Sequence, residues 1–227
     1  MTSKISSYDD WTALLELAEA GDGSAQKEAA SYYDFGLTLS GVTIVPEDKL
    51  KAFEWYNRAY RNGNDDAIIR IADFLSEGIY CDLNIELAIG LYKKGIAKGS
   101  SIAATNLATV FRNEHDYTKA FELYNIAQDI DKSNSLELAI CYYFGIGTEK
   151  NSKKAYEILL EISQNISQFG HFQYDIDEAN YLLGKIYLDG DVVERSIQKA
   201  CYFLKLADTD NDHPSAQHLL AVIGRTN

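Results

Sequence analysis

The chain has 227 residues, of which 46% are apolar and 12% are aromatic, and only two are prolines. This composition is typical of an ordered protein with a continuous core and without long disordered stretches. Asp and Glu outnumber Lys and Arg by 34 to 21, which gives a formal net charge of −13. Such a charge repels nucleic-acid phosphates and anionic membranes and attracts basic surfaces. We therefore expect neither a nucleic-acid partner nor a membrane partner.

The chain is predicted to begin with an unpaired helix over residues 7–20, in which Trp11, Leu15 and Ala18 share one face. After this helix, a pattern of four positions recurs along the chain. It consists of a small residue, an apolar residue, a second small residue and an aromatic residue or leucine, each at a fixed offset from the first. These offsets place the side chains on one face of a helix. The positions that open this pattern are Ala25, Ala67, Ala103, Asn134, Ala179 and Ala216.

A second helix with its own pattern follows each of the first five. Its residues lie four and three positions apart, which keeps three side chains on one face, where the small ones let a neighbouring helix approach. The triplets are Ala52/Tyr56/Ala59, Ala88/Tyr92/Gly95, Ala120/Tyr124/Ala127, Ala155/Leu159/Ile162 and Ala200/Leu204/Ala207. The opening positions recur every 31 to 45 residues, a period that indicates a solenoid.

We predict an all-α fold, a right-handed α–α superhelix of about five helix pairs with a half unit at each end. A single domain over residues 1–227 would hold paired repeats at about 24–63, 66–99, 102–131, 133–163 and 178–210, and a final helix at 214–224. Residues 38–46 are interpreted as a long turn. The insertion 163–177 is too aromatic for an idle linker, and it extends either the flanking helices or a binding surface.

Two stretches carry a family resemblance. Residues 51–59 read Lys-Ala-Phe-Glu-Trp-Tyr-Asn-Arg-Ala and precede Asn-Gly-Asn, and residues 143–155 read Tyr-Phe-Gly-Ile-Gly-Thr-Glu-Lys-Asn-Ser-Lys-Lys-Ala. They resemble the Sel-1-like repeat, a relative of the tetratricopeptide repeat, and the similarity covers nearly the whole chain. Departures are Glu114, in place of a glycine, and Asn134, in place of an opening alanine. The resemblance implies an α-superhelix that binds other proteins, and it carries over no catalytic residue.

The residues that could form an active site are scattered. Cys81, Cys141 and Cys201 are far apart and lack the spacing of a zinc site, so Cys141 and Cys201 are expected to be buried free thiols. His213 and His218 are five residues apart, which places them on different helix faces. We therefore expect no enzyme activity, no metal and no cofactor.

The helix pattern also indicates where a partner would bind. In solenoids related to this family, the side of the first helix that faces away from its neighbours lines a concave groove, and each residue turns that helix by about 100°. This side divides into an acidic N-terminal half and an apolar, aromatic C-terminal half. The predicted partner-binding residues are Asp34, Phe35, Asp66, Ile69, Asp73, Glu77, Tyr143, Phe144, Tyr181 and Leu188. The alternative is that Leu136 and Ile140, on the same side, are core residues covered by the insertion.

The sequence favours a non-catalytic protein-interaction module of a bacterial protein. We expect a cytoplasmic location because no export signal or membrane span is seen. The concave groove of this module would bind a basic protein partner, since grouped aromatics and acids resemble an interaction surface. An immunity protein that neutralises a cognate toxin is one form of this function. An adaptor or scaffold in a signalling or secretion pathway is the alternative, and a hydrolase-type enzyme that uses groove carboxylates is the third interpretation. The oligomeric state is left open.

Overall fold

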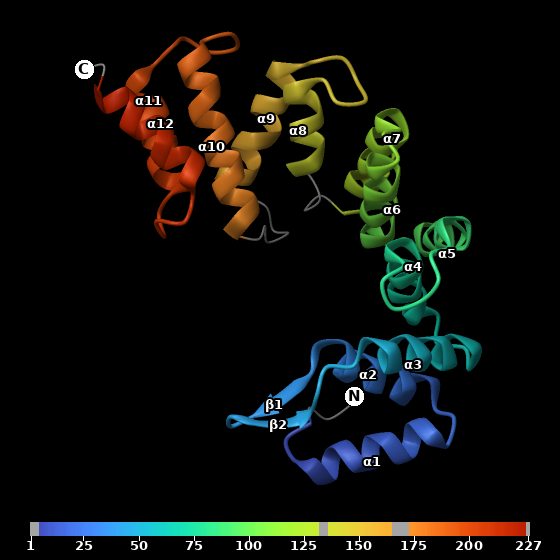
Figure 1. Cartoon of the computed structure of the whole chain (residues 1–227). Helices are drawn as coiled ribbons and strands as arrows, with labels where there is room; N and C mark the ends of the chain where they lie inside the picture. Colours follow the sequence, from blue (N-terminus) through green and yellow to red (C-terminus); the bar gives the residue numbers. More distant parts are fainter. Residues whose placement is uncertain (1–4, 132–135, 165–172, 226–227) are drawn as a thin grey trace. The chain divides into compact units, whose positions relative to one another are not determined.

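A computed structural model describes residues 5–131, 136–164 and 173–225. Over these residues the chain forms twelve α-helices, one 3₁₀ helix and one β-hairpin (Figure 1). It divides within α6 into two compact units, residues 1–106 and 107–227. The expected succession of helices is confirmed.

The first unit contains the unpaired helix, two helix pairs and the start of a third pair. Its elements are α1 (Tyr8–Glu19), α2 (Gly23–Phe35), β1 (Leu37–Leu39), β2 (Val42–Val45), α3 (Lys49–Arg61), the 3₁₀ helix η1 (Asp65–Ala67), α4 (Ile68–Glu77), α5 (Ile85–Ala97) and the beginning of α6 (Ser101–Asn113). Helix α2 packs on α1 and α3, and α4 packs on α3 and α5. Each of these first helices therefore contacts the second helix of its own repeat.

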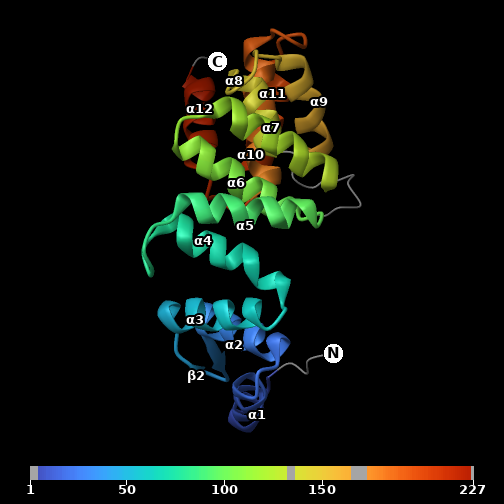
Figure 2. The same ribbon diagram turned by 90° about the vertical axis from the view of Figure 1, so that its right-hand side faces the viewer.

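The second unit continues from α6. Its helices are α7 (Tyr117–Ile130), α8 (Leu136–Phe144), α9 (Ser152–Ser163), α10 (Gln173–Asp189), α11 (Ile197–Ala207) and α12 (Pro214–Arg225). Helix α8 packs on α7 and α9, α10 packs on α9 and α11, and α12 packs on α11 (Figure 2). Residues 173–177 of the predicted insertion form the start of α10, whereas 165–172 lie outside the described residues.

The five second helices begin at equivalent positions for the same local reason. Four residues before the first alanine of each triplet stands an Asp, Asn or Ser, and its side chain accepts a hydrogen bond from a backbone N–H of the first helical turn. Such a cap satisfies a donor that has no partner within the helix. The capping residues are Asp48, Asn84, Asp116, Asn151 and Ser196.

The segment expected to be a long turn at residues 38–46 is largely a β-hairpin. Strands β1 and β2 pair antiparallel, and Ser40 and Gly41 between them have φ values of 49° and 82°. Two consecutive positive φ values are typical of a type I′ turn, whose twist matches that of the paired strands. The β-branched residues of β2 supply the strand propensity. The prediction of a turn is therefore wrong here, although the segment does connect two helices.

The predicted core faces are confirmed. All residues of the five second-helix triplets are buried. Among the opening residues of the first helices, the five alanines are at most 4% exposed, and Asn134 lies outside the described residues. In α1 the buried leucine is Leu14 rather than Leu15. The alternation of small and large side chains thus packs each helix against its neighbours.

Gly147 follows α8 at a point where the backbone approaches α7 closely. Its φ is +68°, and a Cβ at this position would lie 2.0 Å from the backbone oxygen of Tyr117. A left-handed backbone costs a non-glycine residue about 1–2 kcal/mol, and overpacking adds a cost of about 1–3 kcal/mol. We expect Gly147→Ala to lower the free energy of unfolding by at least about 2 kcal/mol, measured by urea-induced unfolding.

Gly90 provides the matched control for this substitution. It lies inside α5, and a Cβ there would meet no atom within 4 Å. Alanine restricts the unfolded chain and has a higher helix propensity, so Gly90→Ala should raise the free energy of unfolding by about 0.5–1 kcal/mol. A similar effect of the two substitutions would contradict the close approach at Gly147.

Candidate partner-binding surface

The acidic half of the predicted surface is only partly exposed. Asp34, near the end of α2, is fully buried, and the side chain of Asp73 in α4 is 13% exposed. Asp66 and Glu77 are exposed, as predicted. The prediction of an exposed carboxylate is therefore wrong for Asp34, and for Asp73 most of the side chain is covered.

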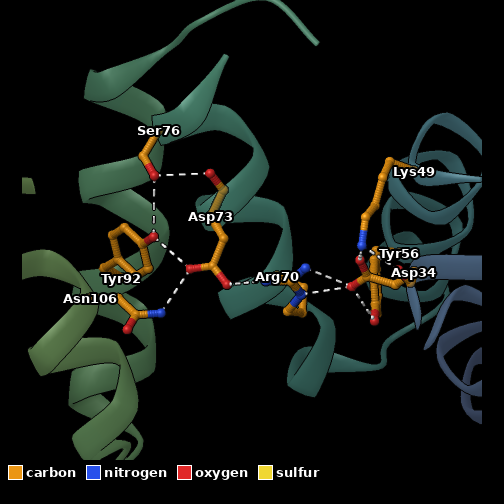
Figure 3. Close-up of polar contacts among 8 residues, drawn as sticks. All are labelled: Asp34, Lys49, Tyr56, Arg70, Asp73, Ser76, Tyr92 and Asn106. Carbon is orange, nitrogen blue, oxygen red and sulfur yellow. Dashed lines mark hydrogen bonds and ion pairs between the residues drawn. The ribbon is translucent and has the colours of Figure 1, made fainter. Parts of the chain in front are cut away.

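Asp34 is buried because two cations pair with it. Its Oδ1 accepts a hydrogen bond from Lys49 Nζ at 3.0 Å, and its Oδ2 accepts hydrogen bonds from Nε and Nη2 of Arg70 at 2.9 and 2.7 Å (Figure 3). The hydroxyl of Tyr56 also donates to Oδ2, at 3.3 Å. A buried charge is tolerated when it is paired and hydrogen-bonded in this way.

Arg70 extends the contacts from Asp34 to Asp73. Its Nη1 donates to Oδ2 of Asp73 at 2.8 Å, and Oδ1 of Asp73 accepts from Tyr92 at 2.7 Å and from Asn106 at 2.8 Å (Figure 3). Burial alone would lower the pKa of Arg70, but the two carboxylates raise it above its ordinary value. These hydrogen bonds and ion pairs link α2 and α3 through α4 to α5 and α6, so three consecutive repeats share one polar network.

The sequence contains a signal for this network. The large residue of the second-helix triplet is tyrosine in the first three repeats and leucine in the last two. A buried tyrosine hydroxyl needs a polar partner, and the first helix supplies Asp34 for Tyr56 and Asp73 for Tyr92. Burial, with the charge of Asp34 adding to it, raises the pKa of Tyr56 to about 12. Asp34 of α2 and Asp73 of α4 therefore have a structural role as hydrogen-bond acceptors for buried tyrosines, whether or not they also contact a partner.

Phe35 remains exposed beside the network. The residue is 67% exposed, and Lys49 Nζ and the guanidinium carbon of Arg70 lie 5.2 and 5.6 Å from the centroid of its ring. The cations that neutralise Asp34 thus also contact an exposed aromatic ring at cation–π distances. Ile69 in α4 is half-buried. Of the two apolar residues that were predicted to contact a partner in the first unit, Phe35 is therefore the more exposed one.

The apolar half of the prediction lies on α8 and α10. Tyr143 is 7% exposed and belongs to the core of the second unit, so the expectation of an exposed ring is wrong for it. Phe144 is 53% exposed, and its ring meets that of Tyr143 edge to face, with the centroids 4.7 Å apart. Tyr181 and Leu188 are half-buried. Leu136 is buried in the same core and Ile140 is partly buried against it, as the alternative interpretation of this face expected. Residues 165–172 of the insertion, which that interpretation placed over them, lie outside the described residues.

A lysine that the partner-site prediction omitted joins these rings. Lys185 of α10 has its Nζ 5.4 Å from the ring centroid of Tyr143, 5.5 Å from that of Phe144 and 5.7 Å from that of Tyr181. Lys150 Nζ lies 5.9 Å from the Tyr143 centroid. We call these five residues the aromatic–lysine cluster. The spacing of four residues between Tyr181 and Lys185, on one helix face, was the available sequence signal.

An acidic hollow lies at the start of α10 and before α12. Its volume is about 460 Å³, and its lining includes Asp177, Glu178, Asp210, Asp212 and the imidazole of His213. Nε2 of His213 lies 3.4 Å from the carboxylate of Glu178. These carboxylates add to the negative surface of the second unit.

The three cysteines are free thiols. Cys141 is buried, as expected, and burial together with the charge of Glu137 raises its pKa to about 11. Cys201, also expected to be buried, is half-buried, as is Cys81. Within the described residues, no group of His, Cys, Asp and Glu side chains could hold a metal ion, and no helix is long and apolar enough to cross a membrane.

The family model described as Sel1 repeat matches residues 23–64, 65–100, 103–127, 136–162 and 177–207. Among solved structures, a protective antigen of uropathogenic Escherichia coli with an SLR fold has a TM-score of 0.75 and 22% identity, over 96% of this chain and 44% of that chain. A Sel1 repeat protein from Oxalobacter formigenes has a TM-score of 0.73 and 18% identity, over 95% of this chain and 82% of that chain. The chain thus spans less than half of the E. coli antigen. These likenesses confirm the predicted α-solenoid fold.

Proposed function

Because the chain belongs to the Sel1 repeat family, a family of protein-interaction modules, we propose that it is a non-catalytic module that acts by binding a protein partner. The observation that carries the proposal is Phe144, an exposed ring seated on the buried Tyr143. Aromatic side chains on a well-packed base supply much of the binding energy in protein interfaces. The ion pairing of Asp34 and Asp73 also supports the non-catalytic assignment, because both carboxylates, which were predicted to line the groove, are engaged by Arg70.

We propose a partner that is basic overall. Asp66, Glu77 and the acidic hollow remain exposed, and the formal net charge of −13 acts at long range. Charges of this kind accelerate the encounter with a basic protein more than they hold it. An immunity protein that neutralises a basic toxin fits this chemistry. An adaptor or scaffold in a signalling or secretion pathway fits it as well.

The rates of binding test this proposal once an affinity-captured partner has been purified. Reversing the exposed carboxylates in the double variant Asp66→Lys/Glu77→Lys should slow association roughly tenfold at low salt and weaken its salt dependence. Phe144→Ala should instead speed dissociation, by about tenfold, with little change in the salt dependence. Surface plasmon resonance separates the two effects.

Val222→Ala in α12 is the control, because Val222 is an apolar side chain with 43% exposure on another helix. It should leave both rates unchanged. An acidic partner would remove the charge argument. Dissociation that is unaffected by Phe144→Ala would remove the proposed contact surface. Protection of cells that produce the partner, lost in Phe144→Ala, would distinguish an immunity protein from an adaptor.

A further inference from the structure

Lys185 is a cation held by aromatic rings rather than by a carboxylate. In the described part of the chain, no carboxylate lies within ion-pair distance of its Nζ, although Asp189 follows one helical turn later. Asp189 and Asp191 act at the hydroxyl of Tyr143, whose pKa rises to about 12 through burial first and these charges second. The positive charge of Lys185 is thus available to an external group.

Arg70 in the first unit shows the contrasting arrangement. Its guanidinium carbon also lies over aromatic rings, 5.6 Å from the centroid of Phe35 and 5.2 Å from that of Phe74. Its charge, however, is compensated by Asp34 and Asp73 at 2.7 and 2.8 Å. The cation–aromatic contact therefore occurs with internal carboxylates at Arg70 and without them at Lys185.

The rings around Lys185 also restrict its position. Three ring centroids within 5.7 Å attract the ammonium group through their quadrupoles, and Tyr143 is fixed by burial. A charge that is already positioned loses less side-chain entropy when it binds. The aromatic–lysine cluster therefore presents a positioned positive charge directly beside the exposed apolar ring of Phe144.

We propose that the aromatic–lysine cluster receives an acidic segment of the partner, in which an Asp or Glu carboxylate pairs with Lys185 and a neighbouring apolar side chain packs on Phe144. Lys150, whose Nζ lies 5.9 Å from the ring centroid of Tyr143, adds a second positive charge to the cluster. The inference rests on the proposed function, because it names the chemistry of the partner at that surface.

A locally acidic contact is compatible with a partner that is basic overall. Exposed charges separated by more than about 8 Å are largely screened at physiological salt, so the distant carboxylates of the chain oppose a carboxylate at Lys185 only weakly. The overall charge acts mainly on the rate of encounter, whereas direct contacts act on the residence time. The net charge of −13 disfavours the other anionic occupants, a nucleic acid or an anionic membrane. A protein segment is therefore the occupant that combines a carboxylate with an apolar side chain.

A library of random linear peptides displayed on phage, selected against the full chain, provides a defined probe. We expect the enriched peptides to contain Asp or Glu next to an aromatic or large aliphatic residue. Their affinity, measured by fluorescence anisotropy with synthetic copies, should fall about tenfold or more in Lys185→Glu and about threefold in Lys185→Met, which keeps the aliphatic stem. It should also fall as salt is raised.

Lys205→Glu is the matched control, because Lys205 is an exposed lysine on α11 outside the cluster. It should change the affinity by less than about twofold. Far-ultraviolet circular dichroism of each variant, with unchanged helix content, shows that a lost affinity does not come from unfolding.

The other outcomes overturn the inference in distinguishable ways. Enriched peptides that are basic or uncharged, or acidic peptides that bind Lys185→Glu unchanged, refute the acidic segment but leave the proposed function standing if Phe144→Ala still weakens binding. If no selected peptide loses affinity in Phe144→Ala, the aromatic–lysine cluster is not a binding surface, and both proposals are refuted. Self-association that Lys185→Glu abolishes, seen by sedimentation, would make a second copy of the chain the occupant instead.

Discussion

Asp34→Ala is expected to lower the free energy of unfolding of the first unit by about 3–5 kcal/mol, the usual cost of removing one partner from a buried ion pair. The variant leaves Lys49 without its main carboxylate and Arg70 with Asp73 alone, although their side chains are only 20% and 35% exposed. Urea-induced unfolding followed by tryptophan fluorescence measures this effect, because both tryptophans, Trp11 and Trp55, lie in the first unit.

Asp66→Ala is the control for this experiment. Asp66 is an exposed carboxylate in the same unit, and the substitution should change the free energy of unfolding by less than about 0.5 kcal/mol. Equal stability of the two variants would show that the buried network contributes nothing to stability. Asp34→Asn, which keeps the shape of the side chain, separates the loss of charge from the loss of volume.

Tyr92→Ala is expected to cost about 3–5 kcal/mol, because it removes a large side chain that is 2% exposed between α4 and α5. Tyr92→Phe keeps the ring and removes only the hydroxyl that donates to Asp73 at 2.7 Å. Its cost should be about 1–3 kcal/mol, since Asp73 keeps its bonds to Arg70 and Asn106. The same unfolding measurement ranks the two variants.

The order of the two Tyr92 variants is the informative result. If Tyr92→Phe is as destabilising as Tyr92→Ala, the hydrogen bond outweighs the packing, and the polar network dominates the first unit. If Tyr92→Phe has no effect, the hydroxyl of Tyr92 contributes nothing to stability. Tyr60→Ala serves as a half-buried tyrosine control on α3 and should cost clearly less than Tyr92→Ala.

The helices and their buried faces could be predicted because their causes are local. Asp48 and its four equivalents cap a helix whose first residues follow directly in the sequence, and the Ala52/Tyr56/Ala59 spacing defines one face without reference to other helices. The hairpin at residues 37–45 was also within reach. Its turn residues and β-branched strand favour a hairpin, but the helical pattern on both sides favoured a plain connection.

The burial of single charged residues could not be predicted in the same way. Asp34 is buried because Lys49 and Arg70, 15 and 36 residues further along the chain, arrive at its two oxygens. Helical periodicity defines which side of α2 Asp34 occupies, but it does not define what stands on that side. Tyr143 is similar, since its position one step outside the pattern suggested exposure and the core of the second unit covers it.

The sequence by itself therefore determined the repeat, the start of each second helix and the residues of the core, because caps and the 3.6-residue period act over one or two turns. Only the tertiary structure decided which of the predicted partner-binding residues are exposed and which charges are paired. Asp34 and Lys185 stand on comparable faces of first helices, yet one meets two cations and the other meets three aromatic rings. Those contacts join residues that are far apart in the chain, and they exist only after the helices have packed.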